Sequence, residues 1–133
     1  MASSPNYAST PTVGAAILTA ANSGSRTAPV GGQTIFTPGA SGAQIERIII
    51  EPVANTVLGT IQIYRVIGGV YYILTEIGIG VQTVSTTVPI APQTIEAVSQ
   101  PVLMPLAMPI GSTLYAVRGV AQTGISIQVE GGS

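Results

Sequence analysis

Short apolar segments separated by turn residues run through most of this chain, and no other feature restricts its possible fold as strongly. From residue 13 onward, runs rich in Val, Ile, Thr and Tyr alternate with clusters of Gly, Pro, Ser and Asn at intervals of about 8 to 15 residues. This spacing is typical of antiparallel β-sandwiches and barrels. No long segment has the periodicity of an amphipathic helix. We therefore expect an all-β antiparallel fold.

Eight to nine strands are predicted, in one domain that covers residues 13–133. The predicted strands are Val13–Ala20, Gln33–Thr37, Ala43–Val53, Leu58–Ile67, Val70–Ile79, Gln82–Ile90 (a strand or an extended loop), Thr113–Val120 and Gly124–Val129. The proline-rich segment Gln93–Ile110 should lie at a sheet edge or pass between sheets, because proline cannot donate to a central ladder. Within it, Leu106 and Met108 are expected to face inward.

The hairpin around Gly68-Gly69 is the most strongly indicated local structure. Two adjacent glycines between apolar strands are typical of a two-residue hairpin turn. The preceding strand alternates, so Ile61 and Ile63 should share one face. Elsewhere, the uninterrupted run Ile48–Ile50 is too apolar for an ordinary exposed strand, which predicts burial on both faces or at an interface.

Residues 1–12 differ from the rest of the chain in composition. They are rich in Ser, Thr, Pro and Asn and show no apolar periodicity. We interpret them as an extended N-terminal arm outside the core, either disordered or ordered against a neighbouring molecule.

The residue types that usually perform enzymatic and metal chemistry are nearly all missing. The 133 residues include no His, Cys, Asp, Lys or Trp. A serine nucleophile would have only glutamate as its base. Two glutamates about 5 to 9 Å apart could hydrolyse a glycoside, but Glu46 and Glu51 should face opposite sides of one regular strand. Calcium sites need loops rich in carboxylates. We expect no enzyme, no metal site and no cofactor.

Charge and hydropathy restrict the partners. Four scattered arginines and five glutamates form no basic patch, so nucleic acid is not an expected partner. Prolines and a glycine interrupt the apolar stretch Ala97–Val117, so a membrane-spanning helix is not expected. The N-terminus lacks the pattern of a secretory signal, which favours synthesis in the cytoplasm. A net charge near zero favours association, so we expect a homo-oligomer.

Two side-chain groups stand out as contact candidates. Tyr71 and Tyr72 follow the glycine turn, where one ring can enter the core while the other stays exposed; exposed tyrosines suit protein contacts and sugar stacking alike. Glu46 and Arg47 could form a local ion pair or a charge pair across a subunit boundary. The simpler interpretation of the tyrosines is that both pack at a sheet edge. The simpler interpretation of Glu46 and Arg47 is that both are solvated surface charges.

Several segments resemble small virion proteins of tailed bacteriophages, and together they span about four fifths of the chain. Those virion proteins share three features: a turn of small residues before a strand with an acidic–basic pair, a leucine–proline–glycine motif just before the penultimate strand, and a closing strand. The segments are Leu18–Asn22, Thr34–Gly42, Ile45–Ile50, Leu106–Ala116 and Ile125–Gly131. The low charge and the proline-rich segment Gln100–Pro109 depart from that pattern.

This resemblance implies a jelly-roll-like β-sandwich that acts as a head decoration or cement protein. Such a protein binds the outside of the major-capsid lattice, commonly as a trimer. The candidate intersubunit contacts are Pro5, Tyr7, Glu46, Arg47, Ile49, Tyr71 and Tyr72. The alternative is a receptor- or carbohydrate-binding module of a head or tail fibre, because jelly rolls also serve lectins. Its platform would be exposed Tyr64, Tyr71 and Tyr72.

Overall fold

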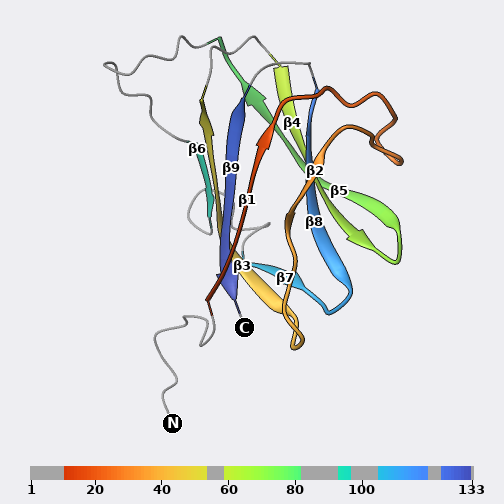
Figure 1. The fold of residues 1–133 in the computed structure, drawn as a ribbon, viewed down its shortest axis with the longest axis vertical. Coiled ribbons are helices and arrows are strands. Elements are labelled where there is room, and N and C mark those ends of the chain that lie inside the picture. Colours follow the sequence, from red (N-terminus) through yellow and green to blue (C-terminus); the bar gives the residue numbers. More distant parts are fainter. Residues whose placement is uncertain (1–10, 54–58, 82–92, 97–104, 120–123, 133) are drawn as a thin grey trace.

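The structure, a computed structural model, describes residues 11–53, 59–81, 93–96, 105–119 and 124–132. Within these ranges the chain forms nine strands in two antiparallel sheets that face each other (Figure 1). The described residues include no helix that is long and apolar enough to cross a membrane. The predicted all-β antiparallel sandwich is confirmed.

The two sheets have five and four strands. The first sheet has the order β1 (Pro11–Leu18), β9 (Ile125–Gly132), β3 (Ala43–Pro52) and β6 (Gln93–Glu96), and β7 (Leu106–Met108) pairs with the start of β3. The second sheet has the order β2 (Gln33–Phe36), β8 (Ser112–Arg118), β4 (Gly59–Ile67) and β5 (Val70–Ile79).

The strand pairing is nested along the chain. The first strand pairs with the last, β2 pairs with β8, β3 pairs with β6 and β7, and β4 pairs with β5. The chain thus resembles one long hairpin wound around a core.

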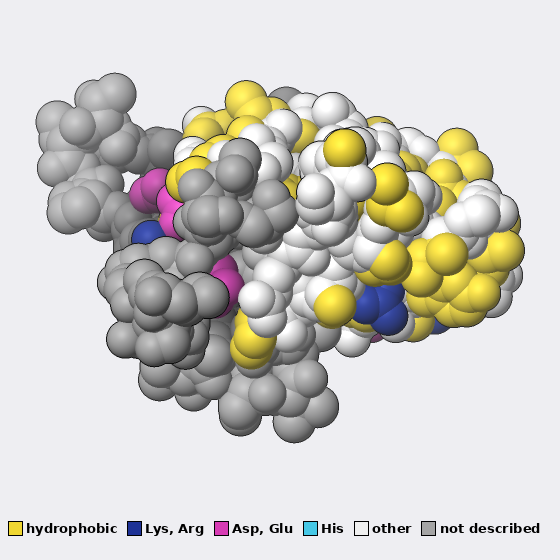
Figure 2. All heavy atoms as spheres, turned by 90° about the horizontal axis from the view of Figure 1, so that it is seen from below, with side chains coloured by type: hydrophobic (Ala, Val, Ile, Leu, Met, Phe, Trp, Pro, Cys, Tyr) yellow, Lys and Arg dark blue, Asp and Glu magenta, His cyan; other side chains and the backbone are white. Residues whose placement is uncertain are grey.

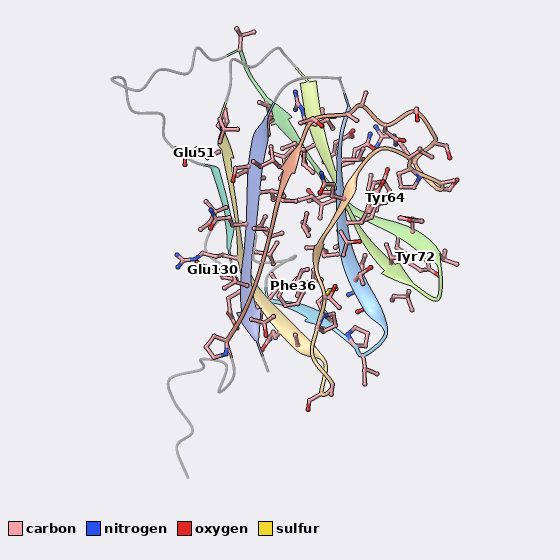
Figure 3. The ribbon with its side chains drawn as sticks, viewed as in Figure 1. Phe36, Glu51, Tyr64, Tyr72 and Glu130 are labelled. Atoms are coloured by element: carbon pink, nitrogen blue, oxygen red, sulfur yellow. The ribbon has the colours of Figure 1, made fainter. Side chains whose placement is uncertain are left out.

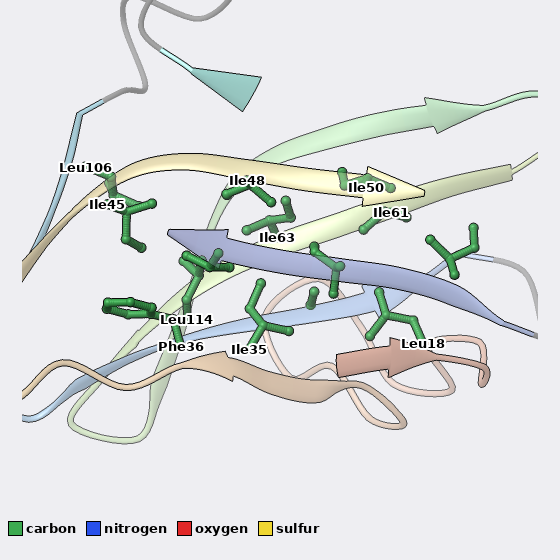
Figure 4. Close-up of a cluster of buried hydrophobic side chains, with 14 of the residues drawn as sticks. Leu18, Ile35, Phe36, Ile45, Ile48, Ile50, Ile61, Ile63, Leu106 and Leu114 are labelled. Atoms are coloured by element: carbon green, nitrogen blue, oxygen red, sulfur yellow. The ribbon is translucent and has the colours of Figure 1, made fainter. Parts of the chain in front are cut away.

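The core lies between the sheets and is filled mainly by isoleucines (Figure 4). Alternate residues of each strand point inward, so Ile48 and Ile50 of β3 face Ile61 and Ile63 of β4, and all four are completely buried. Burial of a side chain of this size contributes about 1.5–3 kcal/mol. The other buried members are Leu18, Ile35, Phe36, Ile45, Ile79, Leu106, Met108, Leu114, Ala116, Ile125, Ile127 and Val129.

The predicted glycine hairpin is confirmed. Gly68 and Gly69 join β4 to β5 with φ angles of 59° and 79°. Positive φ at both central residues defines a type I′ turn, whose twist matches that of the flanking strands. The hairpin extends beyond the rest of the second sheet (Figure 1).

Several predicted boundaries need correction. β1 begins at Pro11, so the last two residues of the predicted arm belong to a strand, and it ends at Leu18 instead of residue 20. Both described parts of the proline-rich segment lie on one edge of β3, as predicted, and Leu106 and Met108 are buried. The predicted strand Gln82–Ile90 lies outside the described residues.

Candidate functional site

The outer side of the first sheet carries three of the predicted contact residues. We call this surface the first-sheet face; Figure 3 shows Glu51 and Glu130 on this flank of the sandwich. Its strands β1, β9 and β3 lie in register, so their outward side chains form rows across the sheet. The rows are Val13–Glu130–Arg47, Ala15–Gln128–Ile49 and Ile17–Ser126–Glu51. The β1 side of this face is therefore apolar, the β9 centre is polar, and the β3 side places Ile49 between two charged residues.

Glu46 lies in a β-bulge, where the pairing of β3 with β9 shifts by one residue. The bulge breaks the regular alternation on which the opposite-face prediction for Glu46 and Glu51 was based, and both glutamates are exposed. The neighbouring Arg47 donates from Nε to the carboxylate of Glu130 on β9. Both partners are partly exposed, so this pair contributes at most about 1 kcal/mol. In the predicted Glu46–Arg47 pair, Arg47 thus forms its ion pair with Glu130 on β9.

Ile49 lies between two core residues but faces away from the core. It is half-buried, whereas Ile48 and Ile50 have no exposed surface. The predicted burial of the isoleucine run is therefore complete on the inner side and partial on the outer side. Val13 and Ile17 on the same face are 66% and 52% exposed.

Tyr71 belongs to a small aromatic cluster on the outer side of the second sheet. Its ring packs edge to face against Tyr64 and Tyr115, with centroids 6.1 Å and 5.1 Å away. Tyr72, the next residue, points to the other side of β5 and is 51% exposed. Tyr64 is completely buried, so the carbohydrate platform predicted from Tyr64, Tyr71 and Tyr72 is wrong in one of its three members.

The loop between β1 and β2 contacts this aromatic cluster, because the amide of Gly32 donates to the Tyr115 hydroxyl at 2.7 Å. Asn22 organises the loop: its Oδ1 accepts hydrogen bonds from the amides of Gly24 (2.9 Å) and Val30 (3.0 Å). The backbone amide of Asn22 donates to the carbonyl of Arg118 at 2.8 Å, and its Nδ2 donates to Gln62 Oε1 at 3.1 Å. The loop is thus fixed to β8 and to β4. The sequence indicated only a polar loop here.

A carboxylate on β5 holds the far side of the same loop. Arg26 donates from Nη2 to both oxygens of Glu76, at 2.9 and 3.0 Å. Thr60 Oγ1 and Gln62 Nε2 also donate to Glu76, at 3.2 and 3.1 Å. The Arg26 hydrogen bonds, followed by that from Gln62, lower the pKa of Glu76. We call these four residues the Glu76 network.

Glu76→Gln should lower the free energy of unfolding by about 0.5–1 kcal/mol at pH 7, because the ion pair with Arg26 is partly exposed. The pKa of Glu76 is lower in the folded state than its ordinary value of 4.5. Its contribution is therefore fully present above pH 4.5 and disappears as the pH falls through the folded-state pKa. Urea unfolding of both proteins at pH 7 and in acid measures this difference.

Glu51→Gln is the matched control, because Glu51 is exposed on the first-sheet face. It should unfold like the wild type at pH 7. If Glu51→Gln and Glu76→Gln behaved alike, the Glu76 network would have no stabilising role.

An open hollow lies at the lower end of the sandwich, where the β4–β5 hairpin passes the turns that precede β3 and follow β7. Its volume is about 680 Å³. Arg65 is the one charged residue among those that line it, and the others include Ala43, Ile67, Met108 and Ile110. No local sequence pattern indicates this hollow, because its walls come from three separate parts of the chain.

The remaining predicted contacts, Pro5 and Tyr7, lie outside the described residues. Within the described part of the chain, no three carboxylates gather in a group that could hold a metal ion. Comparison of the chain with models of protein families, with curated proteins and with solved structures gives no match.

Proposed function

We propose that this chain is a non-enzymatic bacteriophage virion protein that decorates the capsid exterior after synthesis in the host cytoplasm. The observation that carries the proposal is the exposure of large apolar side chains on two separate surfaces of a weakly charged sandwich. One is the first-sheet face, with Val13 and Ile17, and the other surrounds the hollow, with Ile67 and Ile110. Exposed apolar patches are typical of interaction sites, and two of them suit a protein that bridges neighbours.

The first-sheet face is our candidate for contacts between copies of the chain, with a trimer favoured. Arg47 and Glu130 supply opposite charges there, and Ile49 and Ile17 supply apolar area. Interface cores commonly combine apolar side chains with a few arginines. The surface around the hollow would then remain available to the major capsid protein.

Binding of this kind would stabilise a capsid by mass action. A protein that binds the assembled lattice but not the free subunits shifts the equilibrium away from disassembly. At a concentration of 100 times the dissociation constant, each occupied site contributes about 2.7 kcal/mol. Many weakly bound copies would therefore protect a large shell.

The test is thermal disruption of capsids that carry the major capsid protein encoded with this chain. Capsids saturated with the protein should release their genome at a higher temperature than capsids that lack it. The double variant Val13→Ser/Ile17→Ser should sediment as a smaller species than the wild type and protect less. Equal disruption temperatures with and without the wild-type protein would overturn the cement role.

Receptor or carbohydrate binding is the competing proposal. Burial of Tyr64 leaves only Tyr71 and Tyr72, which point to opposite sides of β5, so they do not form one flat stacking surface. Glycan-array binding that is lost in Tyr72→Ala but kept in Glu51→Gln would favour this alternative over capsid decoration.

A further inference from the structure

The hollow at the lower end of the sandwich combines an apolar rim with a single cation. Figure 2 views this end from below and shows hydrophobic side chains gathered beside a cationic group, on the side of the β4–β5 hairpin. Ile110 is 68% exposed on the rim, and Ile67 is 40% exposed. Val70 and Tyr72 on the adjoining β5 strand are 49% and 51% exposed. The apolar surface therefore continues from the hollow onto the hairpin.

Arg65 bridges the two sheets within this hollow. It belongs to β4 of the second sheet, and its Nη1 donates to the carbonyl of Ala107 on β7 of the first sheet at 3.0 Å. Its Nε is buried and makes no hydrogen bond to the described residues. No acidic side chain lines the hollow. The buried Nε is closed to a partner, so an incoming group would meet the terminal nitrogens of the guanidinium. A cation in apolar surroundings with no acidic neighbour favours a carboxylate, which accepts charge-assisted hydrogen bonds from it.

The rim is held by hydrogen-bonded turns. The amide and Oγ of Ser112 both donate to the carbonyl of Pro109, at 3.1 and 2.6 Å. Across the hollow, the amide of Gly42 donates to the carbonyl of Gly39 at 3.0 Å. Because these turns are fixed before any partner arrives, little conformational entropy remains to be lost on binding.

We propose that this hollow binds a glutamate or aspartate side chain presented on an apolar segment of a partner protein. The carboxylate would accept hydrogen bonds from Arg65, while flanking apolar side chains would pack on Ile67 and Ile110. Only the identification of that partner with the major capsid protein rests on the function proposed above. The chemistry of the hollow does not depend on it.

Two blocked peptides test the proposal directly: N-acetyl-Leu-Glu-Leu amide and N-acetyl-Leu-Gln-Leu amide. Each is titrated into the ¹⁵N-labelled full chain while backbone amide shifts are recorded. The glutamate peptide should give saturable shifts at residues 40–43, 65–67 and 107–111. The glutamine peptide should bind about tenfold more weakly, because it lacks the charge-assisted hydrogen bonds. Absence of saturable shifts, or equal affinity for the two peptides, would overturn the proposal.

Variants locate the binding site. Arg65→Gln should reduce affinity for the glutamate peptide to that of the glutamine peptide. Ile110→Ser should weaken both peptides, and its exposure makes a folding defect unexpected. Val30→Ser is the matched control, because Val30 is 55% exposed in the β1–β2 loop, and it should change neither affinity. Loss of binding in Val30→Ser but not in Ile110→Ser would place the site elsewhere and contradict the proposal.

Capsid binding separates this inference from the proposed function. If wild-type protein binds capsids and Arg65→Gln and Ile110→Ser bind equally well, decoration stands and the hollow is not its docking site. If wild-type protein does not bind capsids, decoration fails, whereas selective binding of the glutamate peptide still supports the carboxylate site.

Discussion

Replacing Gly14 with alanine should destabilise the protein by about 3 kcal/mol or more, because a Cβ at this position would lie only 1.8 Å from the carbonyl oxygen of Ile35. That oxygen belongs to the backbone of β2, so no side-chain rotation can relieve the overlap. β1 and β2 belong to different sheets, and the backbones come together at this corner of the sandwich (Figure 1). Thermal unfolding should show a midpoint lower by roughly 10 °C.

Gly78→Ala provides the matched control for this prediction. Gly78 also lies in a strand, but a Cβ there would meet no atom within 4 Å, and its φ is not positive. The free energy of unfolding should change by no more than about 0.5 kcal/mol. A loss in Gly78→Ala as large as that in Gly14→Ala would mean that strand glycines matter here for backbone entropy and not for the close approach of β1 to β2.

Most of the strands could be predicted because two local signals, the alternation of apolar residues and the positions of glycine and proline, agree along the chain. Alternation placed Ile61 and Ile63 on one face of β4, which is the buried one, and the glycine pair fixed the start of β5 at Val70. Proline chemistry placed the segment around Leu106 at a sheet edge. Each of these features depends on residues within one strand or one turn, so no knowledge of distant contacts was needed.

The position of the β1–β2 loop on the outer side of the second sheet could not be predicted from the same signals. Alternation tells which residues share the outer side of β4 but not which loop lies over them. Tyr64 therefore seemed available as an exposed ring, whereas it is buried in a cluster with Tyr115 that the β1–β2 loop contacts. Arg26 and Glu76 are fifty residues apart, and no local pattern joins them. The same holds for Arg65 and Ala107 at the hollow.

A β-bulge explains why alternation fails on β3. Counting back from the buried Ile48 by twos would place Glu46 in the core, where an unpaired carboxylate is very costly. The extra residue at the bulge instead turns Ile45 inward and leaves Glu46 exposed. Such register shifts are set by the partner strand β9, so the sequence of β3 alone does not reveal them.

The isoleucine run of β3 gives the second large prediction. Ile48→Ala and Ile50→Ala should each lower the free energy of unfolding by about 3–4 kcal/mol, because both side chains are completely buried and leave cavities between the sheets. Ile49→Ala should cost only about 1 kcal/mol, because its half-buried side chain lies on the first-sheet face. Urea unfolding of the three variants measures the contrast within a single tripeptide.

Valine substitutions keep this comparison measurable if an alanine variant fails to fold. Ile48→Val and Ile50→Val should cost about 1 kcal/mol each, and Ile49→Val should be close to neutral. In an oligomer, the ranking of the three losses in free energy of unfolding can change. If Ile49 packs against another copy, Ile49→Ala should also shift the protein toward a smaller sedimenting species, whereas Ile48→Val should not. Equal stability losses at all three positions, with no change in sedimentation, would mean that Ile49 is buried within its own domain and is no intersubunit contact.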